Sequence, residues 1–531
     1  MADLSANTGA NSTSRPAPGA PGRPHRPSKP PLICNTTVSL AFGVPEGAEQ
    51  RVNVGLQPDN VSPCSVMIEL NLQHALGLAG ATKQFEKLWT TLPSGISSRK
   101  YVVISDTYVR CELSVDEVRM LAEADEQLAR GNRRERSIYQ IWPDFPVRPQ
   151  VDRSVSTIKG DAARRSYDAT GADITWGVID TGIDATHPHF KSYGTLDGDV
   201  SQLHRDFTMD DNQPLPLRIS SALVDDYGHG SHVAGIIAGS LVGPATATPP
   251  PSFLVAQSVA TPSDMDDVCV RTSVDPLRLS GVAPRCKLVS LRIQGADARN
   301  LSSNVIRALQ YVREELNGNG KLLRVQGVNL SLGYEFDAHW FACGQSPICV
   351  EVNRLVRSGV VVVVAAGNTG YGLLSADQRG TRTGMALTIN DPGNAALAIT
   401  VGSTHRDKPY TYGVSYFSSK GPTGDGRLKP DLVAPGERIT SCAAGQNLEK
   451  MKALLQGKPP ETACYIDDSG TSMAAPHVSG AIAAFLSIRR EFIGQPERVK
   501  EICLANATSL GREKYFEGNG LVDLMRTIQS V

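Results

Sequence analysis

The sequence lacks any apolar run long enough to cross a membrane. Its longest uninterrupted apolar stretch, 360–366, has seven residues, whereas a membrane-spanning helix needs roughly 20. The first residues carry neither the basic segment nor the apolar segment of a secretory signal. We therefore expect no membrane partner and a cytoplasmic rather than a secreted protein.

An excess of positive charge is also absent. The 531 residues include 53 Lys and Arg against 54 Asp and Glu, which gives a net charge of -1. Proteins that bind nucleic acids obtain much of their affinity from basic side chains that displace counterions from phosphates. We therefore expect no nucleic-acid partner. The 40% hydrophobic content is typical of a globular protein, and 531 residues are too many for one ordinary domain.

The ten cysteines are scattered, and none lies in a Cys-x-x-Cys pair. This spacing argues against a zinc site. Cys343 and Cys349 are close enough in sequence to form a disulfide, and Cys442 and Cys464 flank one probable loop. Without a secretory signal, free buried thiols are the favoured interpretation.

The first 146 residues divide into a tail and a small domain. Residues 1–31 are rich in Pro, Gly, Ser, Ala and Arg, so we expect 1–59 to be a disordered tail and linker. Residues 60–146 show the order β-α-β-β-α-β of a ferredoxin-like α+β domain. The expected strands are 66–70, 101–105, 107–113 and 137–142, and the expected helices are 81–92 and one capped by Ser114.

Residues 155–531 alternate between strand and helix patterns, which predicts a doubly wound α/β domain with a mostly parallel sheet. Two stretches, 241–280 and 442–467, show little periodicity, and we expect them to be irregular. The expected strands are 174–179, 287–293, 326–332, 360–365 and 396–401, and the expected helices are 229–240, 302–316, 347–357 and 471–488.

Two polar motifs lie at the boundaries of expected elements of this domain, one after a strand and one at the start of a helix. Asp180 lies where the first strand ends, a position at which a buried carboxylate orients an imidazole or simply caps a turn. His229 opens a helix of small residues in the motif His-Gly-Ser-His-Val-Ala-Gly. We prefer His229 to His232 as a general base, because His232 lies nearly one turn inside the helix, where packing is the simpler role.

Ser472 follows Gly470-Thr471 and begins an alanine-rich helix. A helix N-terminus favours developing negative charge, but an isolated serine at this position is usually only a helix cap. Asn368, at the end of strand 360–365, offers an amide donor for an oxyanion. Asp180, His229 and Ser472 together form the set needed for nucleophilic catalysis, in which the histidine activates the serine and the aspartate orients the histidine.

Residues 170–531 resemble the subtilisin-like serine peptidases, the subtilase family. The matching motifs are Asp-Thr-Gly-Ile-Asp at 180–184, His-Gly-Ser-His-Val-Ala-Gly at 229–235, Gly-Val-Ala-Pro at 281–284, Ala-Ala-Gly-Asn at 365–368 and Gly-Thr-Ser-Met-Ala-Ala-Pro-His-Val-Ser-Gly at 470–480. Asp391-Pro-Gly-Asn and Phe417-Ser-Ser-Lys-Gly-Pro look most like the pyrolysin-like and intracellular branches. Ser231 departs from the family, which usually has threonine there.

The resemblance implies a serine endopeptidase that forms an acyl-enzyme on Ser472. Its peptide substrate would pair with two backbone segments, 294–298 and Ser331-Leu332-Gly333. Asp225 and Asp226 would favour basic residues in a neighbouring subsite, or they are ordinary solvated acids. The chemistry requires no cofactor; calcium is common in the family, but the sequence assigns no metal ligands.

The resemblance also gives the small domain a role. Subtilases are often preceded by a ferredoxin-like propeptide, so we expect 60–146 to act as an intramolecular inhibitor and the zymogen to be self-processed within 143–158. An ordinary accessory domain is the alternative. For the main domain, the alternatives are a catalytically silent binding protein and an esterase, although no Gly-x-Ser-x-Gly elbow encloses Ser472.

Overall fold

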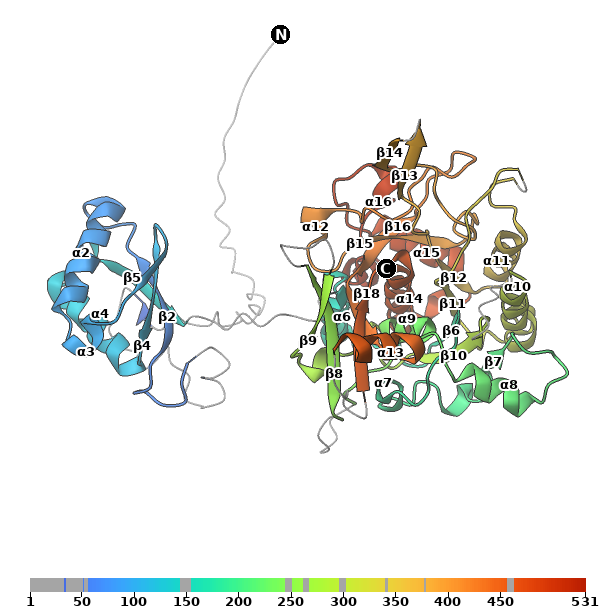
Figure 1. The fold of residues 1–531 in the computed structure, drawn as a ribbon, viewed down its shortest axis with the longest axis horizontal. Helices are drawn as coiled ribbons and strands as arrows, with labels where there is room; N and C mark the ends of the chain where they lie inside the picture. The colour runs from blue at the N-terminus through green and yellow to red at the C-terminus, as the bar shows by residue number, and fades with distance from the viewer. Residues whose placement is uncertain are drawn as a thin grey trace, which may run out of the picture. The chain divides into compact units, whose positions relative to one another are not determined.

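The computed structural model describes residues 33–34, 51, 56–143, 154–243, 251–260, 267–295, 302–339, 342–376, 379–455 and 463–531. The chain forms two compact units, Met1–Arg148 and Pro149–Val531 (Figure 1). The expected tail 1–31, most of the expected processing segment and residues 296–298 lie outside the described residues.

The N-terminal unit is an antiparallel sheet with helices, in the strand order β1-β5-β2-β4-β3. Strands β2 to β5 with helices α2 and α4 follow the β-α-β-β-α-β order expected from the sequence. Strand β1 is an additional edge strand that pairs with β5. The elements are β1 (Ile33–Cys34), β2 (Cys64–Leu70), α2 (Gly77–Thr91), α3 (Ser94–Ser97), β3 (Val102–Ser105), β4 (Tyr108–Leu113), α4 (Val115–Leu128) and β5 (Ile138–Pro143).

Local sequence explains where α4 begins. The Ser114 hydroxyl accepts a hydrogen bond from the Glu117 backbone N–H at 3.2 Å, and the Glu117 carboxylate accepts one from the Ser114 N–H at 2.8 Å. This reciprocal capping box satisfies two backbone donors that the first helical turn leaves free. Phe85 and Leu88 of α2 and Leu121 of α4 are buried in the unit's hydrophobic core, so both helices pack their apolar faces inward.

The larger unit is built on a seven-stranded sheet in the order β16-β15-β12-β11-β6-β10-β7. All neighbouring strands are parallel, and β12 is buried along its whole length, as expected for a sheet covered on both faces. The five strands predicted from the sequence all belong to this sheet, with bounds that differ by a few residues. The strands are β6 (Thr175–Asp180), β7 (Arg205–Asp206), β10 (Lys287–Arg292), β11 (Gly327–Leu330), β12 (Val361–Ala365), β15 (Ile399–His405) and β16 (Leu432–Glu437).

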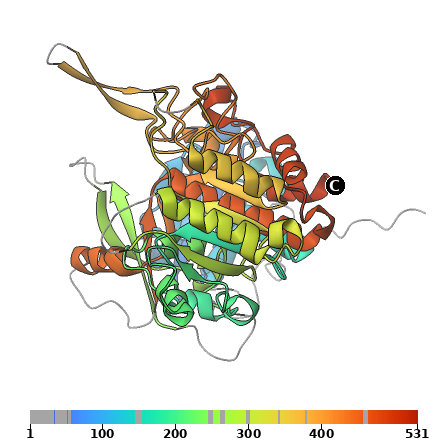
Figure 2. The same ribbon diagram turned by 90° about the vertical axis from the view of Figure 1, so that its right-hand side faces the viewer.

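Helices cover the two faces of this sheet and define two hydrophobic cores. In Figure 2, α10 (Ser302–Tyr311) and α11 (Pro347–Arg357) lie side by side across one face; both contribute to one core. Residues of α9 (His229–Ile237), α14 (Thr471–Ile488), α15 (Pro496–Ala505) and α17 (Leu524–Gln529) belong to the other core. This is the doubly wound α/β fold predicted from the sequence.

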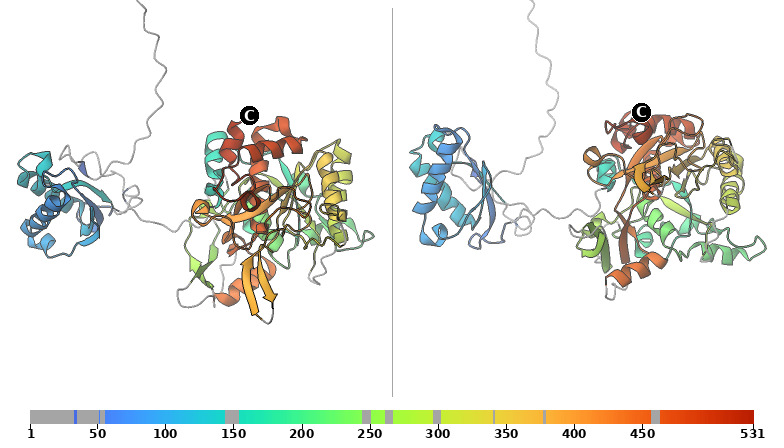
Figure 3. Two further views of the ribbon diagram at one scale, coloured as in Figure 1. Left: turned by 90° about the horizontal axis from the view of Figure 1, so that it is seen from above. Right: turned by 45° about the horizontal axis from the view of Figure 1, so that its top comes forward.

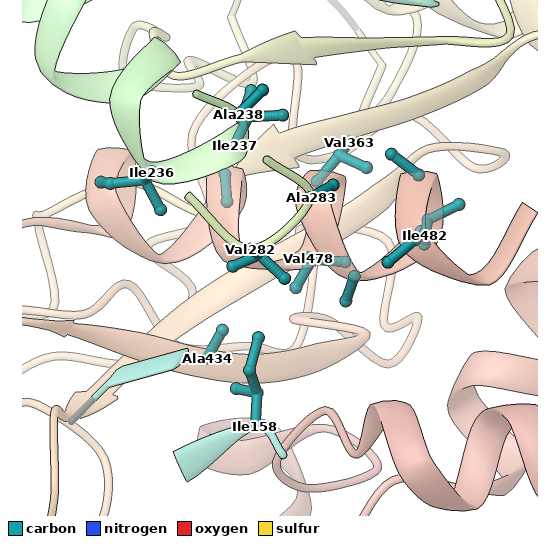
Figure 4. Packing of buried hydrophobic residues seen from close by; sticks show 14 of the residues in the cluster. Ile158, Ile236, Ile237, Ala238, Val282, Ala283, Val363, Ala434, Val478 and Ile482 are labelled. Atoms are coloured by element: carbon teal, nitrogen blue, oxygen red, sulfur yellow. The ribbon is translucent and has the colours of Figure 1, made fainter. Parts of the chain in front are cut away.

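The centre of the second core is helix α14. Figure 4 shows Val478 and Ile482 of this helix among Ile237, Val282 and Val363 from three other segments. By length and composition α14 could cross a membrane, but 83% of its most apolar window is buried inside the unit. Its apolar residues are therefore satisfied by protein packing, as in the core helix of a globular domain.

The two stretches expected to be irregular form a second sheet instead. Strands β8 (Phe253–Ala260) and β9 (Asp267–Thr272) come from the first stretch, β18 (Ala463–Asp468) comes mainly from the second, and β17 (Ile439–Cys442) precedes it. They pair in the order β17-β18-β8-β9. The prediction was wrong because β8 and β18 are parallel partners about 200 residues apart, and no local pattern reports such a pairing.

A separate hairpin leaves the body of the unit. Strands β13 (Tyr371–Ala376) and β14 (Arg379–Gly384) pair with each other alone, and Figures 2 and 3 show them projecting from the rest of the unit. The hairpin begins three residues after Asn368, so it grows from a loop that also carries a candidate site residue.

None of the eight cysteines whose side chains the structure describes forms a disulfide, which agrees with the interpretation favoured from the sequence. Cys442 faces the main core, whereas Cys464 belongs to a small cluster on the other side of the second sheet. In the β17–β18 ladder Cys442 is opposite Tyr465, not Cys464. Because neighbouring strand residues point to opposite faces, these two thiols cannot meet.

Candidate active site

The predicted polar residues come together where three strands of the main sheet end. Strands β12, β11 and β6 are neighbours and parallel, so their carboxyl ends lie along one edge. Asp180 is the last residue of β6, Ser331 follows β11, and Asn368 lies three residues beyond β12. Ser472 reaches the same edge as the second residue of α14.

Asp180 is buried and bonds directly to His229. Its Oδ1 atom lies 2.7 Å from His229 Nδ1, and it also accepts a hydrogen bond of 2.8 Å from the Thr181 backbone N–H. The Asp180 side chain is 3% exposed and that of His229 is 21% exposed. The carboxylate therefore fixes one nitrogen of the imidazole and leaves the other, Nε2, available toward solvent.

The turn before His229 is held by a second buried carboxylate, that of Asp225. Its Oδ1 accepts hydrogen bonds of 2.8 Å from the Thr181 hydroxyl and from the Gly228 N–H, and its Oδ2 accepts one of 2.8 Å from the Ser231 N–H. Gly228 has a φ of 94°, a conformation that favours glycine. Asp225 thus binds the start of α9 to the turn that follows Asp180.

The surroundings of His229 raise its pKa. Burial alone lowers it, but the charge of Asp180, the hydrogen bond to that carboxylate, and the charges of Asp468 and Asp225 together raise the pKa of His229 from 6.5 to about 9. His232 shows the opposite behaviour, because burial lowers its pKa. Its Nε2 bonds to the Ile466 carbonyl at 3.0 Å, so His232 has the packing role that made it the weaker candidate.

Ser472 lies at the N-terminus of α14 and exchanges two hydrogen bonds with Ser331. The Ser472 hydroxyl donates to the Ser331 carbonyl at 2.9 Å, and the Ser331 hydroxyl donates to the Ser472 carbonyl at 2.8 Å. Among the described residues, no hydrogen bond joins Ser472 to His229 in this state. The Ser331 hydroxyl also accepts from Asn329, whose amide oxygen accepts from Ser479 further along α14.

The side-chain amide of Asn368 is oriented by Thr471. Asn368 Oδ1 accepts hydrogen bonds from the Thr471 N–H at 2.9 Å and from the Thr471 hydroxyl at 3.0 Å. Because both are donors, the oxygen of the amide is assigned to this side and the NH₂ group to the other. A Cβ added to Gly470 would lie 3.3 Å from that nitrogen, which places the donor close to the backbone just before Ser472.

One open cavity of about 790 Å³ joins these groups. Its size is typical of a ligand-binding cleft. Its lining includes all seven residues singled out from the sequence, namely Asp180, His229, Asn368, Ser472, Ser331, Leu332 and Gly333. Gln294, the start of the second expected substrate-binding segment, also lines it, together with Tyr227, Ile293 and Ile348.

The proposed subsite role of Asp225 is wrong. Asp225 is 3% exposed and its carboxylate is used within the turn, so it cannot meet a substrate side chain. Asp226 is more exposed, but it forms an ion pair of 2.7 Å with Arg292. Sequence reasoning missed both structural roles, although an acid placed three residues before Gly228 is a known signal for a side chain that bonds its own turn.

The described residues contain no group of three or more His, Cys, Asp or Glu side chains arranged to hold a metal ion. The site as described offers a carboxylate–imidazole pair, a hydroxyl at a helix N-terminus and an oriented amide donor. These are the components of acyl transfer through a serine nucleophile.

Comparison with known proteins supports this interpretation. The model of the subtilase family matches residues 171–521, which include Asp180, His229, Asn368 and Ser472. Pyrolysin from Pyrococcus furiosus is 30% identical over 334 residues, covering 57% of this chain and 21% of pyrolysin.

Two bacterial relatives align over more of their own length. The serine protease AprX from Bacillus subtilis is 26% identical over 388 residues, covering 71% of each chain. The intracellular serine protease from Paenibacillus polymyxa is 28% identical over 392 residues, covering 73% of this chain and 89% of the relative.

Proposed function

Because this chain belongs to the subtilase family of serine endopeptidases, we propose that Ser472 is its nucleophile, that His229 is its general base and that Asp180 orients His229. The substrates are proteins or peptides. The observation that carries the assignment is the 2.7 Å bond between Asp180 and His229 in one cavity with Ser472 and Asn368.

In the first half of the reaction, Ser472 must turn from the Ser331 carbonyl toward His229. A peptide N–H that donates to the Ser331 carbonyl competes for the same acceptor and so releases the hydroxyl, whose resting bond is 2.9 Å. His229 Nε2 takes the hydroxyl proton while Ser472 attacks the peptide carbonyl. His229 then gives this proton to the leaving amine, and the acyl-enzyme forms.

In the second half, a water molecule attacks the acyl-enzyme with His229 again as the base. Both attacks put negative charge on the former carbonyl oxygen. The amide NH₂ of Asn368 and the backbone N–H of Ser472 stabilise this oxyanion at the N-terminus of α14. Asp180 stays charged throughout and stabilises the imidazolium through the bond to Nδ1.

The test of the nucleophile is covalent labelling with a fluorophosphonate probe. Wild-type protein should be labelled and should digest casein, whereas Ser472→Ala should do neither. Ser469→Ala is a matched control, because Ser469 is an exposed serine on the turn before Ser472. Labelling of Ser472→Ala at the wild-type level would exclude Ser472 as the nucleophile.

The same experiment separates the alternative functions. A catalytically silent binding protein would not be labelled in its wild-type form. An esterase would be labelled but would leave casein intact. The bond between Asp180 and His229 and the oriented Asn368 amide in the cavity of Ser472 argue against a silent protein. Membership of a family of serine endopeptidases argues against an esterase.

We further propose that the N-terminal unit is an intramolecular inhibitor and that the chain processes itself within 143–158. The support is that Met1–Arg148 is compact, has its own hydrophobic core and precedes the matched region 171–521. Wild-type protein should then yield a shortened species, Ser472→Ala should stay intact, and the separate N-terminal unit should inhibit the shortened enzyme. Full activity of an intact wild-type chain would contradict both roles.

No step of this mechanism uses a metal ion or an organic cofactor. We therefore propose that the chemistry requires none, and that any calcium would act on stability alone. Treatment with EDTA should leave kcat unchanged at a temperature well below the unfolding transition. A proportional loss of kcat that calcium restores would contradict this.

A further inference from the structure

Arg292 is a buried guanidinium immediately beside the candidate active site. It is the last residue of β10, directly opposite Asp180 in the parallel ladder, and its side chain is 7% exposed. The backbone on both sides is fixed, since the Ile293 N–H donates to the Asp180 carbonyl and the Phe207 N–H donates to the Arg292 carbonyl. The mechanism described above does not use this residue.

The guanidinium donates hydrogen bonds to four groups on two different segments. Nη2 donates to the Asp226 carboxylate at 2.7 Å, and Nε donates to the Gln294 carbonyl at 3.2 Å. Nη1 donates to the carbonyls of Ser221 at 2.9 Å and Val224 at 3.2 Å. A buried cation needs such partners, because an unpaired charge is costly away from water.

A second carboxylate, that of Asp206, balances the charge from the other side. Asp206 is 1% exposed and its Oδ2 lies 3.8 Å from Arg292 Nε. The same oxygen accepts a hydrogen bond from the Ser221 hydroxyl at 2.5 Å. Ser221 lies in the last turn of α8 (Leu215–Ala222), where positive charge is favourable. The Arg292 side chain is therefore fixed in place rather than free to choose partners.

The two segments that Arg292 joins have different roles at the cavity. Asp226 precedes Tyr227 and Gly228 in the turn that leads to His229, whereas Gln294 lines the cavity where an extended substrate would pair. The Asp226 carbonyl also accepts a hydrogen bond from the Gln446 N–H at the start of α13 (Gly445–Leu454). The turn before His229 is thus held on both sides.

From this arrangement we infer that Arg292 is a positioning residue. It holds the Gln294 backbone, where an extended peptide would pair, at a fixed position relative to the turn that carries His229. The inference rests on the proposed function. Only a planar guanidinium can reach Asp226, Gln294 and the carbonyls at and just after the end of α8 at once; a lysine keeps the charge but cannot donate in all these directions. In Arg292→Lys the Gln294 carbonyl loses the hydrogen bond from Nε and is free to move.

The test compares an extended substrate with a minimal one. Casein cleavage sites are first mapped with the wild-type enzyme, and a tetrapeptide p-nitroanilide and the p-nitrophenyl ester of its last residue are made from one site. In Arg292→Lys, KM for the tetrapeptide should rise by roughly three- to tenfold, the effect of one well-oriented hydrogen bond. The ester should keep its kcat/KM within about twofold, because it does not reach Gln294.

Asp226→Asn should raise the tetrapeptide KM in the same direction, and the double variant should raise it by less than the product of the two single effects. The matched control is Arg285→Lys, which changes a half-exposed arginine just before the opposite end of β10. All rates are divided by the concentration of active sites titrated with the fluorophosphonate, so that misfolded protein does not lower the measured kcat.

If Arg292 has a purely structural role, Arg292→Lys should lower the melting temperature and reduce kcat/KM for the tetrapeptide and for the ester in the same proportion. This result would overturn the inference. If Arg292→Lys does not fold, Asp226→Asn becomes the test. An unchanged KM for the tetrapeptide in Asp226→Asn would also contradict the inference. Failure of the proposed function is a separate outcome, because the wild-type enzyme would then not be labelled or would not cleave the tetrapeptide.

Discussion

At the scale of single residues, we expect the charges around His229 to set the pH range in which the enzyme is active. Burial lowers the pKa of His229, but Asp180, which bonds to the imidazole, and the charges of Asp468 and Asp225 raise it. The net effect stabilises the protonated imidazole. In the proposed mechanism, a protonated His229 cannot accept the proton of Ser472, so the charges that raise the pKa of His229 also move the onset of activity to higher pH.

We therefore expect an alkaline activity profile. With the pKa of His229 raised to about 9, kcat/KM should fall as pH drops through that value. The stabilisation from the ion pair is fully present below pH 6.5 and is lost as pH rises through about 9. Half-maximal kcat/KM near pH 6.5 would contradict the expectation. Asp180→Asn should lower the apparent pKa and reduce kcat on the order of 10⁴-fold.

Asn368 gives a second prediction at this scale. Asn368→Ala removes the amide donor while Thr471 and Ser472 remain, so kcat should fall on the order of 10²- to 10³-fold with little change in KM. Asn506→Ala, at the end of α15, is the control and should change neither constant. A variant that lost affinity but kept kcat would show that Asn368 binds substrate rather than the oxyanion.

At the scale of secondary-structure elements, helix ends and helix faces carry measurable stability. Ser114→Ala removes the serine half of the capping box at α4, which should cost about 1 kcal/mol. The loss should appear as faster hydrogen exchange in 115–128 and a lower denaturation midpoint of the N-terminal unit. Ser98 is an exposed residue that ends α3 through its backbone N–H, so Ser98→Ala should leave both unchanged.

Helix α14 gives the corresponding prediction for packing. Ile482 is fully buried in the main core, so Ile482→Ala should reduce the free energy of unfolding by about 2–5 kcal/mol. Leu454→Ala in α13 is the control, because Leu454 is 53% exposed. Both variants should be made in the Ser472→Ala background and compared by chemical denaturation. Without the proposed nucleophile, self-digestion cannot change the measured free energy of unfolding.

At the scale of the whole molecule, packing stabilises the described residues without disulfide cross-links. Eight cysteines have side chains that the structure describes, none of them is in a disulfide, and seven of them are buried. We expect a reducing agent to leave the melting temperature unchanged. Cys343 is the one part-buried thiol in that described set, so it should react before the other seven with a thiol reagent. Resistance to all labelling until reduction would show that disulfides had formed.

The division into two units follows from the same packing. Each unit has its own hydrophobic core, as expected of parts that fold separately. The ferredoxin-like order of the N-terminal unit was predictable, because its strands and helices alternate over short distances and α4 carries its own cap. The order of strands and helices does not determine whether this unit inhibits the enzyme, so its inhibitory role stays a proposal.

The sequence by itself determined the elements and motifs that local chemistry specifies. The apolar run 360–366 can only be a buried strand or core segment, and Gly470-Thr471-Ser472 before an apolar helix places a serine at a helix N-terminus. Asp180, His229, Asn368 and Ser472 each lie near a strand end or helix start, where backbone groups are free to support chemistry. Position alone does not separate them from ordinary caps, and they were selected by their combination and by the resemblance to subtilases.

Only the tertiary structure decided which distant segments meet. It paired β8 with β18 into a sheet that no periodicity indicated, buried Asp225 under the turn of His229, and joined Asp226 to Gln294 through Arg292. The physical reason is that hydrogen bonds and charges act over a few ångströms in space. Residues far apart in sequence become partners only after the hydrophobic core has brought their strands together.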